Sequence, residues 1–235
     1  MNMANKKIGI IGGQGPVSTA DMYMRIINNF QSAYGAKNIG DYPPMLIASL
    51  PTDDLISGLE TKDWLVKQIS PSIKLFDDYG AEIIAIACNT LHAIYDELAK
   101  LTDTHIIHLP NTVAQEVARQ NYKCVGILGT NTTVQHRLYE SHLDDHSIKY
   151  LYPESFEQNE LLKLIYQINA GEIIDQTILP ALVNHLSSRG ADAVVLACTE
   201  LPTILDNYNL DELSAKLIDC NEIYAQEIAR LAHGK

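Results

Sequence analysis

Residues 80–90 read GAEIIAIACNT, and residues 190–200 repeat the pattern as GADAVVLACTE. Each copy opens with Gly-Ala and an acidic residue, continues as a short apolar run rich in β-branched residues, and ends on Ala-Cys followed by polar residues. Short apolar runs introduced by a glycine turn are typical of buried strands, and polar residues after such a run can begin a helix. The repeat therefore predicts that Cys88 and Cys198 lie where two parallel strands end.

A thiol in that position is well placed for chemistry. Open α/β sheets bind ligands in the crevice at the carboxyl ends of their strands, and a neighbouring helix N-terminus lowers the pKa of a thiol. Two such thiols facing one pocket suggest paired acid-base chemistry at Cys88 and Cys198. The competing interpretation is a small buried apolar residue, which Cys124 fits because it lies inside a strand run. Cys220 also follows a short strand but has no counterpart in the other half, so it is a weaker candidate.

The composition bounds the fold and the class of partner. The chain has 235 residues, 46% of them hydrophobic, which is enough for one large core or two smaller ones. A formal charge of −12 argues against nucleic acid or an anionic membrane as partner. No run reaches the length of a signal-peptide core or a membrane span, so we expect a soluble cytoplasmic protein. The 4 cysteines form no CxxC pair, which disfavours disulfides and a structural zinc site.

Strand-like and helix-like segments alternate along the whole chain, as in α/β proteins. The predicted strands are 6–12, 44–50, 82–87, 105–109, 123–129, 147–151, 192–197 and 217–219. The predicted helices are 18–31, 62–79, 91–100, 133–143, 157–169, 172–188 and 222–232. We predict two similar α/β domains, residues 1–106 with 214–235 and residues 107–213, each a mainly parallel sheet flanked by helices. The last strand and helix are expected to return the chain to the first domain.

Two further motifs admit more than one interpretation. The turn Gly12-Gly13-Gln14-Gly15-Pro16 follows the first strand, but Ser18 stands where a dinucleotide-binding motif needs its third glycine. A turn whose N–H groups face a ligand is favoured over such a site, and a purely structural turn is nearly as favoured. His142 and His146 are spaced like a metal pair, yet they lie far from either cysteine turn, which favours a solvated helix end.

His92 and Glu200 each fall on the first helical turn behind one of the two cysteines. A side chain in that place could orient the thiol or tune its pKa. For Glu200, capping of the following helix is the alternative interpretation.

The motifs around the two cysteines resemble those of a known family. Ile86-Ala87-Cys88-Asn89-Thr90 with His92, and Leu196-Ala197-Cys198-Thr199-Glu200-Leu201-Pro202, resemble the two signature segments of the cofactor-independent aspartate/glutamate racemases. The opening IGIIGGQGPVSTADMY is similar to the aspartate racemase branch, and the likeness spans essentially the whole chain. The resemblance implies two pseudo-symmetric α/β domains, an active site in the cleft between them, commonly a homodimer, and no cofactor or metal.

The resemblance also implies a mechanism and a set of site residues. One cysteine, as thiolate, would remove the α-proton of a small amino-acid substrate, and the other, as thiol, would return a proton to the opposite face, with Cys88 and Cys198 in these roles. The implied substrate-binding residues, which hold the α-carboxylate or lie beside it, are Gly13, Gln14, Asn89, Thr90, Thr130, Thr199 and Glu200.

The chain departs from the aspartate racemase branch where that branch holds the side-chain carboxylate. Ile56 falls at the position expected for an arginine, and Asn169 at the position expected for a lysine. Asp53 and Asp54 would repel an acidic side chain if they faced the cleft. The substrate therefore stays open. Alternatives are a related cysteine-pair enzyme acting on another carboxylate or a hydantoin-like substrate, and an amino-acid-binding protein without turnover.

Overall fold

The first half of the protein forms a parallel sheet. The structure, a computed structural model, describes residues 5–52, 55–56, 58 and 61–234. The strands of this sheet are β1 (Ile8–Gly12), β2 (Met45–Ser49), β3 (Ile83–Ile86) and β4 (His105–Ile106). They pair in the order β2-β1-β3-β4, all in parallel. The strand that precedes Cys88 therefore lies in the interior of its sheet.

The second half repeats this arrangement. Its strands are β5 (Cys124–Gly129), β6 (Lys149–Leu151), β7 (Ala193–Ala197) and β8 (Lys216–Asp219). They pair in parallel in the order β6-β5-β7-β8, so β7 occupies the place in this sheet that β3 occupies in the other. The expected fold of two pseudo-symmetric α/β domains is confirmed. The repeated GA…AC pattern is the sequence of these two equivalent strands.

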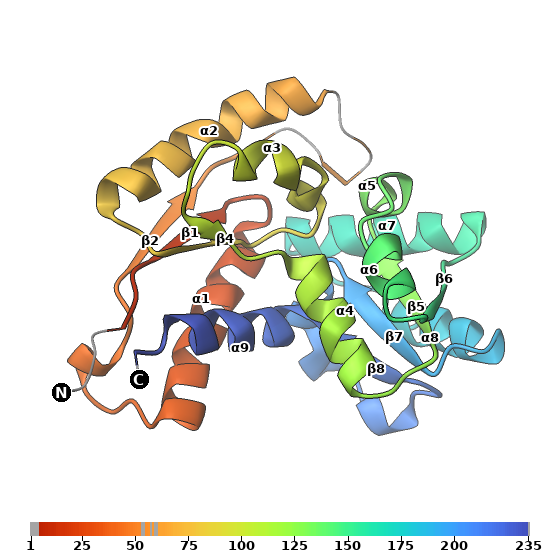
Figure 1. The fold of residues 1–235 in the computed structure, drawn as a ribbon. Coiled ribbons are helices and arrows are strands. Elements are labelled where there is room, and N and C mark those ends of the chain that lie inside the picture. The colour runs from red at the N-terminus through yellow and green to blue at the C-terminus, as the bar shows by residue number, and fades with distance from the viewer. Residues whose placement is uncertain (1–4, 53–54, 57, 59–60, 235) are drawn as a thin grey trace.

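Helices cover both faces of each sheet. They are α1 (Pro16–Tyr34), α2 (Lys62–Tyr79), α3 (Tyr95–Ala99), α4 (Leu109–Arg119), α5 (Asn131–Gln135), α6 (Glu140–Asp144), α7 (Ser155–Ala170), α8 (Ile178–Ser188) and α9 (Cys220–Ala232), with 3-10 helices η1 (Ile39–Asp41), η2 (Thr90–Ile94), η3 (Leu201–Asn207) and η4 (Leu210–Glu212). Figure 1 shows α2 and α3 on one side of the first sheet and α1 and α9 on the other. Of the described helices, none combines the length and apolarity that crossing a membrane requires.

Side-chain alternation along the strands divides the core into layers. In β3, Ile84 and Ile86 join an outer cluster with α2, while Ile83 and Ala85 join a central cluster. Successive side chains of a strand point to opposite faces, and a parallel sheet covered on both faces needs apolar residues on both. This requirement explains why these strands read as unbroken apolar runs.

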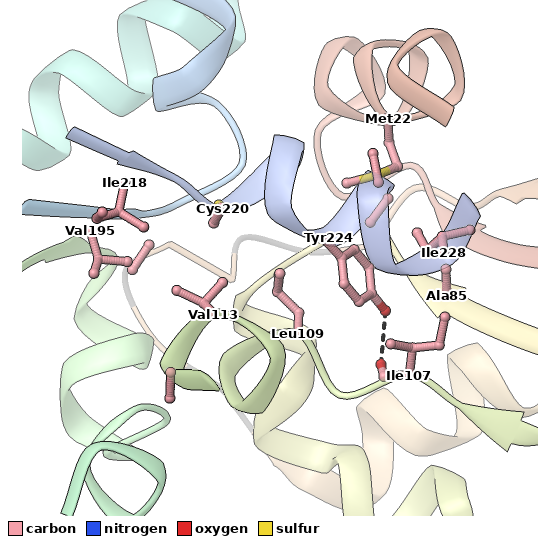
Figure 2. Packing of buried hydrophobic residues seen from close by; sticks show 14 of the residues in the cluster. Met22, Ala85, Ile107, Leu109, Val113, Val195, Ile218, Cys220, Tyr224 and Ile228 are labelled. Carbon is pink, nitrogen blue, oxygen red and sulfur yellow. Dashed lines mark hydrogen bonds between the residues drawn. The ribbon is translucent and has the colours of Figure 1, made fainter. Parts of the chain in front are cut away.

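The central cluster is shared by the two halves of the protein. It lies around α1, α4 and α9 and includes Met22, Val113, Tyr224, Val195 and Ile218, which come from both halves of the chain (Figure 2). Helix α9 packs against α1 and α4. Because one apolar cluster joins the two sheets, the strand ends of both are held relative to each other.

The expected return of the chain to the first domain at residue 214 is placed too early. Strand β8 pairs with Ala193–Leu196 of β7 and so extends the second sheet. Only the following helix, α9, packs against α1 of the first half. A short apolar strand carries no signal for which of two similar sheets it joins, since both offer a parallel edge.

Several predicted elements differ in extent. The helix expected over 133–143 is divided into α5 and α6. Arg137, between them, adopts a positive φ of 53°, which is incompatible with a continuous helix. The helix expected from 172 begins at Ile178, after Asp175 Oδ1 accepts the N–H of Thr177 in a local turn (2.9 Å). The predicted strand 105–109 is only His105–Ile106, because the chain there turns into the unpredicted helix α4.

The hydroxyl of Tyr224 gives a test of the shared core. It donates to the Ile107 carbonyl (2.8 Å) and accepts from the Ile86 N–H (3.1 Å), and all three groups are buried. Tyr224→Phe should lower the free energy of unfolding by about 2 kcal/mol, because two buried backbone groups lose their partner. Thermal unfolding should then begin about 4–8 °C lower for a chain of this size.

Tyr23→Phe is the matched control for this substitution, since Tyr23 is 38% exposed on α1. The control should unfold in urea as the wild type does. A Tyr224→Phe protein as stable as the control would contradict the role given to this hydroxyl.

Candidate active site in the cleft between the two sheets

A cleft enclosing about 180 Å³ lies at the carboxyl ends of strands from both sheets. Its described lining comprises Gly13, Gln14, Gly15, Thr52, Leu55, Ile56, Cys88, Asn89, Thr90, Thr130, Asn169, Cys198, Thr199 and Glu200. Every residue predicted as catalytic or substrate-binding is in this set. These residues follow β1, β2 and β3 in one sheet and β5 and β7 in the other, with one more from α7, which is where α/β sheets bind ligands.

Cys88 lies two residues beyond β3 and is 6% exposed. Its sulfur receives hydrogen bonds from the N–H groups of Thr90 and Leu91 and from the Thr90 hydroxyl, all of which favour the thiolate. Burial outweighs them and, with the charge of Glu200, raises the pKa of Cys88 to about 12. This side chain is therefore a neutral thiol near neutral pH.

Cys198 directly follows β7, is 4% exposed and contacts Glu200. Its thiol donates to Glu200 Oε2 (3.0 Å), and the same oxygen accepts from the Thr199 hydroxyl (3.2 Å). The other carboxylate oxygen, Oε1, accepts from the Ser18 hydroxyl (3.1 Å). Burial, and then the negative charge of Glu200, raise the pKa of Cys198 well above its usual value. Glu200 makes no side-chain cap to η3, so its contact is with the thiol and not with the helix end.

His92 acts on the loop of Cys88 and not on the sulfur. Its Nε2 accepts from the Leu109 N–H (3.1 Å), so the ring proton is on Nδ1, which donates to the Cys88 carbonyl (3.0 Å). Burial lowers the pKa of His92 to about 4, which keeps the ring neutral. The expected role of orienting the cysteine is therefore fulfilled through the backbone.

The side chains expected to hold a carboxylate are partly engaged with one another. The Asn89 amide faces the interior, where its oxygen accepts from the Tyr139 hydroxyl and its nitrogen lies 3.4 Å from Cys220 Sγ. The Thr90 and Thr130 hydroxyls lie 3.1 Å apart and share a hydrogen bond. Hydroxyl groups can rotate to a ligand, whereas the amide of Asn89 is held by buried partners. The Thr90 and Thr130 hydroxyls are therefore better placed than the Asn89 side chain to donate hydrogen bonds to a ligand.

The glycine turn after β1 lines the cleft and holds a buried side-chain acceptor. The Gly13 N–H donates to Thr19 Oγ1 (3.0 Å), and Gln14 Nε2 donates to the Leu50 carbonyl (2.7 Å). Gln14 Oε1 is buried and has no hydrogen-bond partner among the described residues. Gly15, at a φ of 101°, lies against Glu200, where an added Cβ would come within 1.9 Å of Oε1. The expectation that the N–H groups of this turn face a ligand stays a prediction.

The two positions where the aspartate racemase branch carries an arginine and a lysine line the cleft in this protein. Ile56 and Asn169 are both among its lining residues. Asp53 and Asp54, whose charges would matter here, lie outside the described residues. Thr52 and Leu55 also line the cleft but were not predicted from the sequence. They follow the end of β2 as Cys88 follows the end of β3, so the rule that ligands bind at the carboxyl ends of parallel strands would have found them.

The other candidates lie away from the cleft lining. Cys220 is buried in contact with the Asn89 amide, and Cys124 is the first residue of β5. The ring of His142 packs 4.7 Å from that of His108, and His146 is exposed. Over the described part of the chain, no three His, Cys, Asp or Glu side chains gather as a metal site.

Comparison with known proteins gives a consistent result. The sequence model of the family described as Asp/Glu/hydantoin racemase matches residues 11–228. The broad specificity amino-acid racemase RacX of Bacillus subtilis (strain 168) is 31% identical over 202 residues, which cover 85% of this chain and 88% of RacX. The family match over residues 11–228 includes both cysteine turns, and the alignment with RacX covers 85% of the chain. The likeness is therefore not confined to one half.

Solved structures match the fold as well. An aspartate racemase homologue from Pyrococcus horikoshii OT3 superposes with a TM-score of 0.78 at 28% identity, covering 97% of this chain and 99% of that one. Aspartate racemase of Picrophilus torridus superposes with a TM-score of 0.78 at 24% identity, covering 98% and 95%. The second likeness concerns the fold alone.

The charge of Glu200 can be tested through thiol titration. Glu200→Gln removes a negative charge that raises the pKa of both thiols, so both pKa values should fall and the thiolate fraction at a given pH should rise. We expect iodoacetamide to modify Cys198 faster in this variant, as followed by peptide mass spectrometry across pH.

Glu172→Gln is the control for Glu200→Gln, because Glu172 is exposed and does not line the cleft. Its alkylation profile should match that of the wild type. An unchanged or slower reaction of Cys198 in Glu200→Gln would show that the carboxylate does not suppress the thiolate.

Proposed function

The chain belongs to the Asp/Glu/hydantoin racemase family, and we propose that it is an amino-acid racemase in which Cys88 and Cys198 exchange the α-proton without a cofactor. The observation that carries the proposal is that both thiols, from equivalent strand ends of two sheets, line one cleft of amino-acid size. Inversion of a carbon needs a base on one side and an acid on the other. A duplicated fold supplies such a pair by its symmetry.

The reaction balances without another reactant. In one direction a cysteine thiolate takes the α-proton and becomes a thiol, leaving a carbanion stabilised by the α-carboxylate. The opposite thiol gives its proton to the other face of that carbon and becomes a thiolate. The reverse reaction exchanges the two roles. After one turnover the first cysteine is a thiol and the second a thiolate, and a turnover in the reverse direction or proton exchange with water restores the original protonation.

Formation of the first thiolate depends on the substrate's own charge. Burial and the charge of Glu200 hold the pKa of both thiols above the usual value. An α-ammonium group entering this region brings a positive charge that favours the ionised sulfur. The Cys198 thiol donates a hydrogen bond to Glu200 Oε2 (3.0 Å), and the N–H groups of Thr90 and Leu91 stabilise a thiolate at Cys88.

The carbanion also needs donors at the carboxylate, where negative charge grows. The hydroxyls of Thr90, Thr130 and Thr199 line the cleft and can turn toward a ligand. Donors held in a buried site stabilise a developing oxyanion more strongly than water does. We therefore assign these hydroxyls to the α-carboxylate.

Replacement of either thiol tests the proposal. Cys88→Ser and Cys198→Ser should each lower kcat/KM for racemisation by about 10³-fold or more, because a serine hydroxyl is far less acidic than a thiol. Activity is measured as loss of optical rotation from single enantiomers of a broad amino-acid panel. Cys124→Ser, outside the cleft, should keep wild-type activity.

A wild-type protein that neither inverts any amino acid nor exchanges its α-proton would contradict racemisation. Tight amino-acid binding without exchange, unchanged in both cysteine variants, would point to a binding protein instead. The homodimer and the cytoplasmic location expected from the sequence stay predictions.

A further inference from the structure

We infer that the substrate of this cleft is an amino acid whose side chain carries no carboxylate. The inference rests on the proposed racemase function and names the substrate class of the same site. It departs from the aspartate specificity that the opening sequence motif implies.

The described lining of the cleft carries no positive charge. None of the described lining residues is Lys, Arg or His. The chain also has no basic residue between Lys37 and Lys62, a stretch that contains β2 and the whole loop after it. A carboxylate transferred from water into a mainly buried site is costly unless a charged partner or several donors replace the water. The described lining offers a side-chain carboxylate no charged partner.

Two basic residues on either side of this stretch in the sequence, Arg25 and Lys62, form ion pairs with acidic side chains. Lys62, the first one after β2, lies 3.3 Å from Glu97. Arg25 on α1 makes ion pairs with Asp21 (2.7 Å) and Asp219 (2.9 Å). Each would have to leave an acidic partner to reach a substrate.

The described lining of the cleft instead includes side-chain acceptors. Glu200 is the charged residue of the described lining, and it is an acid. Gln14 Oε1 is a buried acceptor that has no hydrogen-bond partner among the described residues, and its orientation follows from the other end of the amide. Because the Leu50 carbonyl can only accept, Nε2 must face it (2.7 Å), so the oxygen cannot exchange places with the nitrogen. These two acceptors suit an α-ammonium group and repel a second carboxylate.

The rest of the lining suits an uncharged or apolar chain. Thr52, Leu55, Ile56 and Asn169 contribute apolar surface and neutral polar groups. The loop is tied to the other half of the protein at Leu55, whose carbonyl accepts from the Thr132 hydroxyl (2.8 Å). If the threonine hydroxyls bind the α-carboxylate, the side chain of the substrate contacts this surface.

A substrate panel tests the inference. Single enantiomers of alanine, leucine, methionine, glutamine, lysine, aspartate and glutamate are incubated with the enzyme in heavy water, and deuterium at Cα and inversion are followed. We expect kcat/KM for at least one non-acidic amino acid to exceed those for aspartate and glutamate by about tenfold or more, which corresponds to about 1.4 kcal/mol of differential transition-state binding. Aspartate or glutamate as the fastest substrate would overturn the inference and leave the racemase function intact. Absence of exchange with every amino acid would overturn both.

A designed cation tests the reason for the preference. Asn169→Lys places a positive charge in the cleft lining and should raise the ratio of kcat/KM for aspartate over that for the best non-acidic substrate by about tenfold. Ile173→Lys is the matched control, since Ile173 is 96% exposed and outside the lining. It should keep the wild-type ratio. An Asn169→Lys protein that folds, as judged by thermal unfolding, and yet keeps the wild-type ratio would overturn the argument from the missing cation.

Discussion

Helix α9 packs between the two sheets, and the geometry of the cleft depends on this packing. Its first residues contact both cysteine loops: Asn221 Nδ2 donates to the Thr199 carbonyl (2.8 Å), and Cys220 Sγ lies 3.4 Å from the Asn89 amide nitrogen. One turn later, Tyr224 bonds the backbone around β3 and β4. The proposed reaction requires two thiols at a fixed separation on opposite faces of one atom, and this helix joins the loops that carry Cys88 and Cys198.

The electrostatics of the cleft follow from its burial. Burial and the negative charge of Glu200 raise the pKa of both thiols, and the described lining holds no cation that would offset them. Both sulfurs are therefore neutral thiols. In the proposed reaction, an amino acid would supply a positive charge through its ammonium group. The proposed mechanism would then restrict reactive thiolate to the substrate-bound site, and it would disfavour a substrate that brings a second negative charge.

The fold was predictable from the sequence where a pattern had a single physical meaning. Buried parallel strands read as apolar runs, and the duplicated run before Cys88 and Cys198 predicted two equivalent sheets and the strand ends that line the cleft. Strand β8 was misplaced because pairing partners are not encoded in a short apolar run. The orientation of Gln14 and the inward turn of Asn89 depend on Leu50 and Tyr139, which are distant in sequence, so no local pattern predicts them.

The measurement that tests the two-thiol account most directly is the isotope content of both enantiomers early in a reaction run in heavy water. Two opposed monoprotic thiols remove the α-proton on one face and deliver solvent deuterium on the other. The account therefore predicts that the newly formed enantiomer is fully deuterated at Cα, while the recovered starting enantiomer still carries hydrogen. Deuterium appearing equally in both enantiomers from the start would mean that a single base serves both faces, and would contradict the pairing of Cys88 with Cys198.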